Sequence, residues 1–280
     1  MSAHENETGW FAEALAGDRF EMWFQPIVDT SIHKVMAHEC LVRLNHRRVY
    51  KGAEILEAAA ASHQTVAFDS YSRRLAITSA AGQTGDRAGA RYFINFIPSS
   101  ISVPEQCMKP ALAALTQSGL DPANIVFEAV EAGAAHDIAH MRRIRDWCRT
   151  EGFGFSLDNL GTGASAPQMV CDLRPDFIRL DRSLAMNIER PKYAGAVRRL
   201  VEVAARFDAR VIAVGVEKPE TMENLWLLDV QWMQGYLFGR PSPSITRQGS
   251  SSSLLLNPDL VHLSDAMNSS YRTRPGLWVV

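Results

Sequence analysis

The sequence lacks the features that mark several specialised classes of protein. No apolar run approaches the roughly 18 to 20 residues that span a bilayer, and residues 1–8 are polar, unlike the basic-then-apolar start of a signal peptide. The four cysteines lie far apart and form no C-x-x-C pair, so neither a disulfide framework nor a structural zinc site is indicated. We therefore expect a cytoplasmic protein with reduced cysteines that engages no membrane.

The 280-residue chain also lacks an excess of positive charge. It has 29 Lys and Arg against 31 Asp and Glu, a formal net charge of −2, which excludes a protein that holds a nucleic-acid polymer by bulk charge. Hydrophobic residues make up 46% and charged residues 21% of the chain, and such values are typical of a folded globular protein. Any anionic ligand must therefore be met by a local group of side chains.

Apolar, β-rich runs recur along the chain with helical stretches between them. The strand-like runs are residues 20–28, 34–44, 91–96, 124–128, 153–158, 177–181, 210–216 and 232–236. Apolar residues at helical spacing occupy residues 109–118, 136–151, 193–208 and 221–229, among others. Repeated strand-then-helix units predict an α/β fold, either a closed parallel barrel, which the length favours, or a doubly wound open sheet.

The pattern weakens after Pro243, and residues 249–253 read as a Gly/Ser linker. We predict a lead-in over residues 1–19, a barrel domain over 20–245, and a linker with a C-terminal tail over 246–280. The tail contains apolar residues without a clear period, so it packs on the barrel, engages a partner or is frayed. No internal repeat and no second large domain are indicated.

Polar residues follow several of the predicted strands. They are Asn95, Glu128, Asp158, Glu217 and Gln234. Because loops leave an α/β barrel at the carboxyl ends of its strands, we expect these side chains to share one pocket; the alternative is that each caps a strand or starts a turn. Together with Glu39, the residues Asn95, Glu128 and Asp158 form an all-oxygen set of the kind that selects Mg²⁺, Mn²⁺ or Ca²⁺.

The motifs around these residues resemble one family. They are Gln25-Pro26-Ile27-Val28, Glu39-Cys40-Leu41-Val42-Arg43, Phe93-Ile94-Asn95-Phe96, Phe127-Glu128-Ala129-Val130-Glu131, Leu157-Asp158-Asn159-Leu160-Gly161-Thr162-Gly163, Ile178-Arg179-Leu180-Asp181, Val214-Gly215-Val216-Glu217 and Gln234-Gly235-Tyr236. In order and spacing, over roughly residues 20–243, the chain resembles the EAL family of bacterial cyclic di-GMP phosphodiesterases and their inactive relatives.

The resemblance implies a TIM-type (β/α)8 barrel with an irregular first strand. It also implies roles for single residues. Glu39, Asn95, Glu128 and Asp158 match the ligands of a Mg²⁺ or Mn²⁺ ion, Arg43 the arginine that grips a substrate phosphate, Gln25 and Gln234 the glutamines of the pocket, and Glu131 the glutamate that steadies the loop after Asp158. In this family that loop also helps to form homodimers.

Three positions depart from the active members of the family. Asn159 replaces the second of two aspartates, Arg179 replaces a lysine, and Val214 replaces the glutamate that partners the attacking water. Loss of a general base costs about two to four orders of magnitude in rate. Glu217 is retained, but it lies three residues beyond Val214 and must rearrange to take its place.

These substitutions predict a degenerate EAL domain rather than an enzyme. It binds cyclic di-GMP with little or no hydrolysis, holds one divalent ion or none, and acts as a receptor or a regulator of a protein partner. Two alternatives remain open: a working cyclic di-GMP phosphodiesterase in which Glu217 or a water chain supplies the base, and a protein-interaction module without nucleotide binding.

Overall fold

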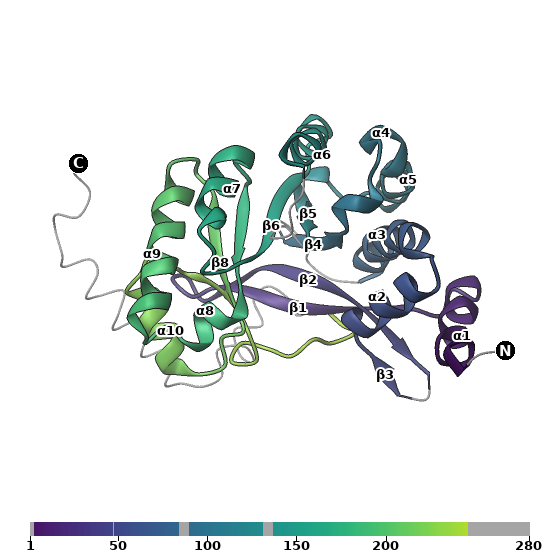
Figure 1. Cartoon of the computed structure of the whole chain (residues 1–280), viewed down its shortest axis with the longest axis horizontal. Helices are drawn as coiled ribbons and strands as arrows, with labels where there is room; N and C mark the ends of the chain where they lie inside the picture. Colours follow the sequence, from purple (N-terminus) through teal and green to yellow (C-terminus); the bar gives the residue numbers. More distant parts are fainter. Residues whose placement is uncertain (1–2, 47, 84–89, 131–136, 246–280) are drawn as a thin grey trace.

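The computed structural model describes residues 3–46, 48–83, 90–130 and 137–245, and the side chains from residue 9 onward. Figure 1 shows helices arranged around a central set of strands. The helices are α1 (Ala3–Ala16), α2 (Gly52–Ala61), α3 (Thr65–Gly82), α4 (Pro104–Cys107), α5 (Lys109–Ser118), α6 (Ile138–Thr150), α7 (Ser165–Leu173), α8 (Arg182–Met186), α9 (Pro191–Ala205) and α10 (Pro219–Trp226), with short 3-10 turns at Pro98–Ser100 and Pro122–Asn124.

The strands close into a barrel. They are β1 (Glu21–Asp29), β2 (Lys34–Asn45), β3 (Val49–Tyr50), β4 (Arg91–Phe96), β5 (Ile125–Ala129), β6 (Gly154–Leu160), β7 (Phe177–Leu180), β8 (Arg210–Val214) and β9 (Trp232–Gln234). The order β1-β9-β8-β7-β6-β5-β4-β2 is closed by the pairing of β1 with β2, and β3 forms a hairpin on β2 outside this ring.

The predicted closed barrel is confirmed, and the alternative of an open, doubly wound sheet is wrong. The eight runs predicted from the sequence are the eight strands of the ring. The irregularity of the first strand is its direction: β1 pairs antiparallel with both β2 and β9, whereas the other neighbours in the ring are parallel. A tight turn between β1 and β2 replaces the helix that joins parallel strands.

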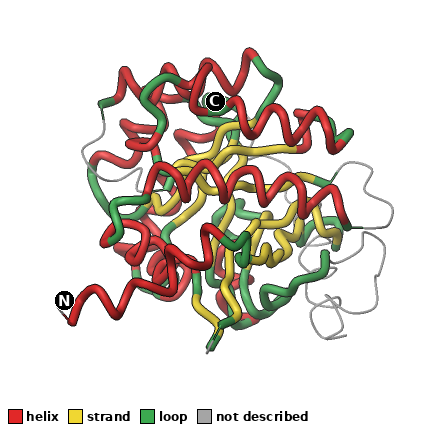
Figure 2. Tube along the Cα trace, turned by 90° about the vertical axis from the view of Figure 1, so that its right-hand side faces the viewer, coloured by secondary structure: helices red, strands yellow, loops and turns green. Residues whose placement is uncertain are grey.

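Local sequence signals set the ends of the helices that cover the barrel. The side chain of Asp137 accepts a hydrogen bond from the backbone N–H of Ala139 at the start of α6, and Asp181 caps α8 in the same way through Ser183. Helix α5 ends at Gly119, whose φ of 69° is a left-handed conformation that glycine adopts without strain. Figure 2 shows the helices wrapped around the strands.

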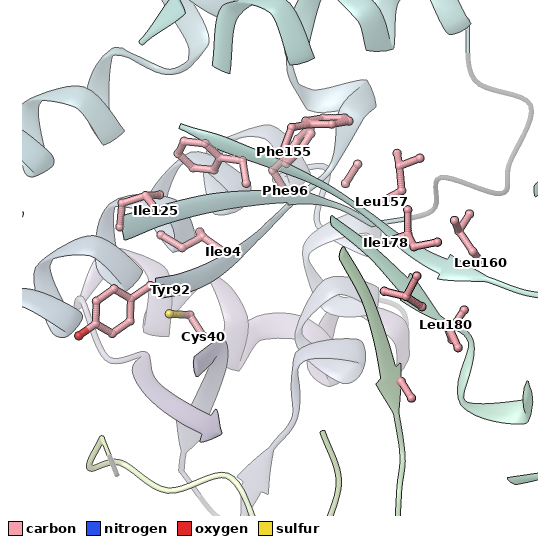
Figure 3. Packing of buried hydrophobic residues seen from close by; sticks show 14 of the residues in the cluster. Cys40, Tyr92, Ile94, Phe96, Ile125, Phe155, Leu157, Leu160, Ile178 and Leu180 are labelled. Atoms are coloured by element: carbon pink, nitrogen blue, oxygen red, sulfur yellow. The ribbon is translucent and has the colours of Figure 1, made fainter. Parts of the chain in front are cut away.

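The main core lies between the outer face of the strands and the helices. Alternate strand residues such as Ile94, Phe96, Phe155 and Leu180 are at most 1% exposed and point to this layer, as Figure 3 shows. A separate cluster of Ile27, Ala37, Phe93, Val126, Phe177, Ile212 and Trp232 comes from the opposite, inward side of the strands. This packed plug closes the bottom of the barrel and leaves its upper end for other side chains.

The predicted domain limits remain predictions. Helix α1 extends over most of that segment, and its Phe11 packs with Phe20 and Phe68. The predicted tail, residues 246–280, lies outside the described residues. Within the part of the chain that the structure describes, no helix is both long and apolar enough to cross a membrane.

Candidate functional site at the barrel mouth

The register of the strands produces a polar layer directly above the apolar plug. Residues two apart on a strand point to the same face. Two positions from each plug residue, towards the carboxyl ends of the parallel strands, the same inward face therefore carries a further residue. These inward-facing residues above the plug are Gln25, Glu39, Asn95, Glu128, Arg179, Val214 and Gln234. With Asp158 at the end of β6, they form what we call the mouth layer.

Arg179 lies at the centre of the mouth layer and is 2% exposed. Its Nη1 donates to Glu128 Oε1 at 2.5 Å, and its Nη2 donates to Glu39 Oε2 at 3.0 Å. Its Nε lies 3.8 Å from Asp158 Oδ1. One guanidinium therefore contacts all three acids of the predicted ligand set, which reach it from three different strands.

Two glutamines complete this network. Gln234 accepts a hydrogen bond from Arg179 Nη2 at 2.6 Å and donates to Glu39 Oε2 at 2.7 Å. The same amide nitrogen lies 3.2 Å from Gln25 Oε1, while Gln25 donates to the backbone carbonyl of Gly239 at 3.0 Å. The amide of Asn95 is 3.4 Å from Glu39 Oε1. The structure thus brings together Gln25, Glu39, Asn95, Glu128, Asp158 and Gln234.

The mouth layer separates the pKa values of its carboxyl groups. Burial acts to raise the pKa of Glu39, but the ion pair with Arg179 and the hydrogen bonds from Arg179, Gln234 and Asn95 lower it overall. Burial raises the pKa of Glu128 well above its usual range, since the nearby charges of Asp158 and Glu39 add to an effect that Arg179 only partly offsets. The pKa of Asp158 is also raised, chiefly by burial.

Arg179 itself stays charged. Burial alone would lower its pKa, but the charges of Glu128, Glu39 and Asp158 outweigh it and raise the pKa well above the ordinary value. Three acids surround this one guanidinium, and each of them acts to keep its positive charge. The layer is therefore a compact network in which the charged groups are paired with one another.

A cavity of about 410 Å³ opens beside the mouth layer. Its polar lining includes Arg43, Lys51, Asn95 and Asn159, and its apolar lining includes Leu41, Leu56, Phe96, Ile97 and Val130. Arg43 donates to the backbone carbonyl of Val42 at 2.8 Å, which uses only part of its guanidinium fork. Cationic groups beside apolar walls suit a ligand that combines negative charge with flat rings.

Comparison with known proteins assigns the family. The EAL domain family model matches residues 9–241. The chain belongs to the EAL family. Cyclic di-GMP phosphodiesterase RocR of Pseudomonas aeruginosa is 26% identical over 245 residues, which cover 82% of this chain and 59% of RocR. The chain thus spans less than two thirds of the length of this curated relative.

Solved structures agree with this assignment. A standalone EAL protein from Vibrio cholerae O395, in its c-di-GMP-bound form, is 28% identical, with a TM-score of 0.71 over 82% of this chain and 95% of its own. A manganese and cyclic di-GMP complex of Klebsiella pneumoniae BlrP1 is 24% identical, with a TM-score of 0.71 over 81% of this chain and 57% of its own, and shares the fold.

Other residues expected from the EAL resemblance lie apart from the network. Glu217 is exposed and pairs with Arg182 Nη2 at 2.6 Å, so the expectation that it shares the pocket with the other strand-end residues does not hold in this arrangement. Asn159 is exposed, with a left-handed φ of 57° at the irregular pairing of β6 with β7, and it lines the cavity. Glu131 lies outside the described residues.

Val214 ends β8 and pairs in register with Gln234. Its side chain belongs to the mouth layer but has no atom that accepts a hydrogen bond. Where the resemblance expects a glutamate beside the attacking water, this EAL chain therefore presents a methyl-bearing surface.

The metal expected from the EAL resemblance does not fit the side chains as they are arranged. The donors are chemically suitable, and the buried Asn95 Oδ1 and Glu128 Oε2 have no hydrogen-bond partner among the described residues. However, a Mg²⁺ or Ca²⁺ ion needs oxygens at about 2.0 to 2.6 Å from one point, and here the carboxylates converge on a guanidinium. In the described part of the chain, no group of three or more His, Cys, Asp or Glu side chains is arranged to hold a metal ion.

The central place of Arg179 was not predicted from the sequence. The sequence identified it only as a substitution for lysine. A usable signal was present, since Arg179 is the single charged residue in the otherwise apolar β7. A cation inside a buried strand requires acidic partners on neighbouring strands, and the three acids were already identified.

Proposed function

We propose that this EAL domain binds cyclic di-GMP with little or no hydrolysis and acts as a receptor or regulator. The observation that carries the proposal is Val214, which occupies a mouth-layer position beside Gln234 and offers no base to a water molecule. Glu217 does not compensate for it, because its carboxylate is exposed and paired with Arg182.

Ligand binding is supported by the cavity and by the relatives. Arg43 lies at the edge of the mouth layer in a cavity of about 410 Å³, and its planar fork suits a phosphate. The Vibrio cholerae structure, 28% identical, is a c-di-GMP-bound form. Retention of the binding side of the site together with loss of the base favours a receptor over a protein-interaction module that has abandoned the nucleotide.

Isothermal titration with cyclic di-GMP, followed by chromatography for the linear dinucleotide, tests the proposal. We expect one ligand per chain and no measurable product. Arg43→Ala should weaken binding at least tenfold, or about 1.4 kcal/mol, whereas Arg48→Ala, a matched change at an exposed arginine paired with Glu54, should leave it unchanged. Turnover near one per second, ordinary for an enzyme, would defeat the claim of inactivity, and absence of binding would defeat the claim of a receptor.

The proposal includes a cytoplasmic location, a protein partner and a homodimer contact through the loop after Asp158. That loop presents the exposed residues Thr162, Gly163, Ala164 and Ser165. Light scattering of the wild type should give twice the mass of one chain, and Ala164→Arg should give the mass of one. A wild-type monomer at all concentrations would exclude the dimer and leave the receptor proposal standing.

A further inference from the structure

The mouth layer contains its own cation in the place where the EAL family resemblance expects a metal. Nitrogens of the Arg179 guanidinium lie within 3.8 Å of a carboxylate oxygen of Glu39, Glu128 and Asp158. The contacts with Glu39 and Glu128 are direct hydrogen bonds of 3.0 Å or less. We infer that Arg179 is the resident cation of this site and that it excludes a divalent ion from it.

The fold holds the guanidinium in this position. Arg179 stands on β7 directly above Phe177, whose ring packs against Phe93 and Trp232 in the plug. Below it the barrel is filled, and on its sides Glu39, Glu128 and Gln234 accept from its donors. The side chain is 2% exposed and donates from both terminal nitrogens, so a movement away from this position would break hydrogen bonds in a buried site.

The chemistry of the guanidinium makes the exclusion permanent. An arginine does not lose its proton at any ordinary pH, so it cannot become neutral when a metal approaches. Its planar fork satisfies several carboxylates at once, while lysine carries a compact charge on a flexible stem that can swing aside. A divalent ion at the three acids would stand beside this fixed positive charge and compete for the same oxygens.

The amide of Gln234 is oriented to bind the guanidinium and the carboxylate of Glu39 at the same time. Its amide oxygen faces Arg179 Nη2 at 2.6 Å, while its amide nitrogen faces Glu39 Oε2 at 2.7 Å. The nitrogen thus covers the same carboxylate oxygen that Arg179 holds, so an entering metal would have to displace two donors from it. The inference concerns the side chains alone and stands whether or not cyclic di-GMP binds.

Metal binding without nucleotide tests the inference directly. Chelator-treated protein is titrated with Mn²⁺, free Mn²⁺ is counted by electron paramagnetic resonance, and the Tm is measured with and without Mg²⁺ and Mn²⁺. The wild type should bind no stoichiometric Mn²⁺, and its Tm should change by less than about 1 °C. One tightly bound Mn²⁺ per wild-type chain would overturn the inference.

Variants at Arg179 test the cause. Arg179→Gln leaves the three acids without a cation, so it should have a lower Tm in chelator, bind one Mn²⁺ per chain and regain several degrees of Tm with the metal. Arg182→Gln, which removes an exposed arginine paired with Glu217, should bind none. If Arg179→Gln does not fold, Arg179→Lys keeps the charge, frees the fork and should gain measurable Mn²⁺ binding. Failure of every folded Arg179 variant to bind Mn²⁺ would show that Arg179 is not what excludes the ion.

Discussion

At the scale of single residues, the site is decided by the difference between a guanidinium and an ammonium. A buried ion pair is costly to form and still more costly to break, because removal of one partner leaves an unpaired charge at a cost of about 3 to 5 kcal/mol. Arg179 has three such partners and an amide acceptor. The same contacts that stabilise the mouth layer therefore hold the guanidinium in place among the three acids.

Restoring the residues of the active family members at positions 159, 179 and 214 should restore activity. Val214→Glu restores the glutamate expected beside the attacking water, and Asn159→Asp restores the second of the two aspartates. Arg179→Lys restores the lysine, whose flexible side chain can move away from the acids. We expect the triple variant to produce linear dinucleotide in Mn²⁺ at a rate at least about a hundredfold above the wild type, the usual effect of a general base. Chromatography of the product measures the rate.

A matched control is the same triple variant with Glu39→Gln, which removes an acid of the mouth layer and should abolish the gain. The combination without Arg179→Lys should stay silent if the guanidinium blocks the metal. A triple variant that binds both nucleotide and Mn²⁺ but remains inactive would show that the defect lies outside these three positions.

The cysteines should differ sharply in reactivity. Burial raises the pKa of the Cys40 and Cys148 thiols, and nearby acids raise it further. At Cys107 burial acts in the same direction, but hydrogen bonds with the backbone of Val103 and with Ser102 outweigh it and lower the pKa. Alkylation of the folded protein near pH 8, followed by peptide mass spectrometry, should modify Cys107 well before Cys40 or Cys148. Equal rates for the three thiols would contradict the burial seen here.

Sequence reasoning names several of the residues that the structure brings together in the mouth layer, but not how they pair. The strand-end pattern predicts that Asn95, Glu128 and Asp158 converge, because the carboxyl ends of parallel strands share one edge. It does not give the exposed position of Glu217, since the chain leaves β8 at Gly215, whose φ of 79° turns the backbone away from the strand direction. The ion pairs of Arg179 depend on side-chain geometry that spacing along the chain does not contain.

At the scale of elements, strands were easier to predict than helices. The strands of the ring are apolar on the outer face, which packs on the helices, and also on the inner face below the mouth layer, and such runs stand out in a sequence. Helix α3 is less apparent, since Asp69 and Arg73 are buried in it as an ion pair. A charged pair in the buried stripe of a helix breaks the apolar period on which the prediction rests.

Closure of the barrel should depend on Gly235. A Cβ at this position would lie 1.9 Å from the backbone oxygen of Val216, where the segment after β8 crosses β9. Gly235→Ala forces the two segments apart and should lower the free energy of unfolding by about 3 kcal/mol or more. Urea denaturation followed by circular dichroism measures the change.

Gly82→Ala is the comparison for Gly235→Ala. Gly82 ends α3, and a Cβ there meets no atom within 4 Å. We expect its stability to be unchanged or raised by up to about 1 kcal/mol, as for alanine in place of glycine in a helix. Equal stability of the two variants would mean that β8 and β9 approach less closely than the structure indicates.

At the scale of the whole molecule, α1 packs on the barrel through an aromatic cluster. Phe11 is fully buried, and its ring centroid lies 5.8 Å from that of Phe20 and 5.5 Å from that of Phe68. This aromatic cluster joins α1 to the start of β1 and to α3. Packing therefore crosses the predicted boundary at residue 20, and the contribution of the lead-in to stability can be tested by mutation.

Phe11→Ala should destabilise the entire chain rather than α1 alone. Loss of a fully buried phenylalanine costs about 3 to 5 kcal/mol, and because its neighbours belong to the barrel, unfolding should remain a single transition with a lower midpoint. Denaturation followed in parallel by circular dichroism and tryptophan fluorescence, with the exposed Glu13→Ala on the same helix as control, measures the effect. If Phe11→Ala leaves the midpoint unchanged, or if an early separate transition appears, α1 is an independent lead-in and the barrel folds without it.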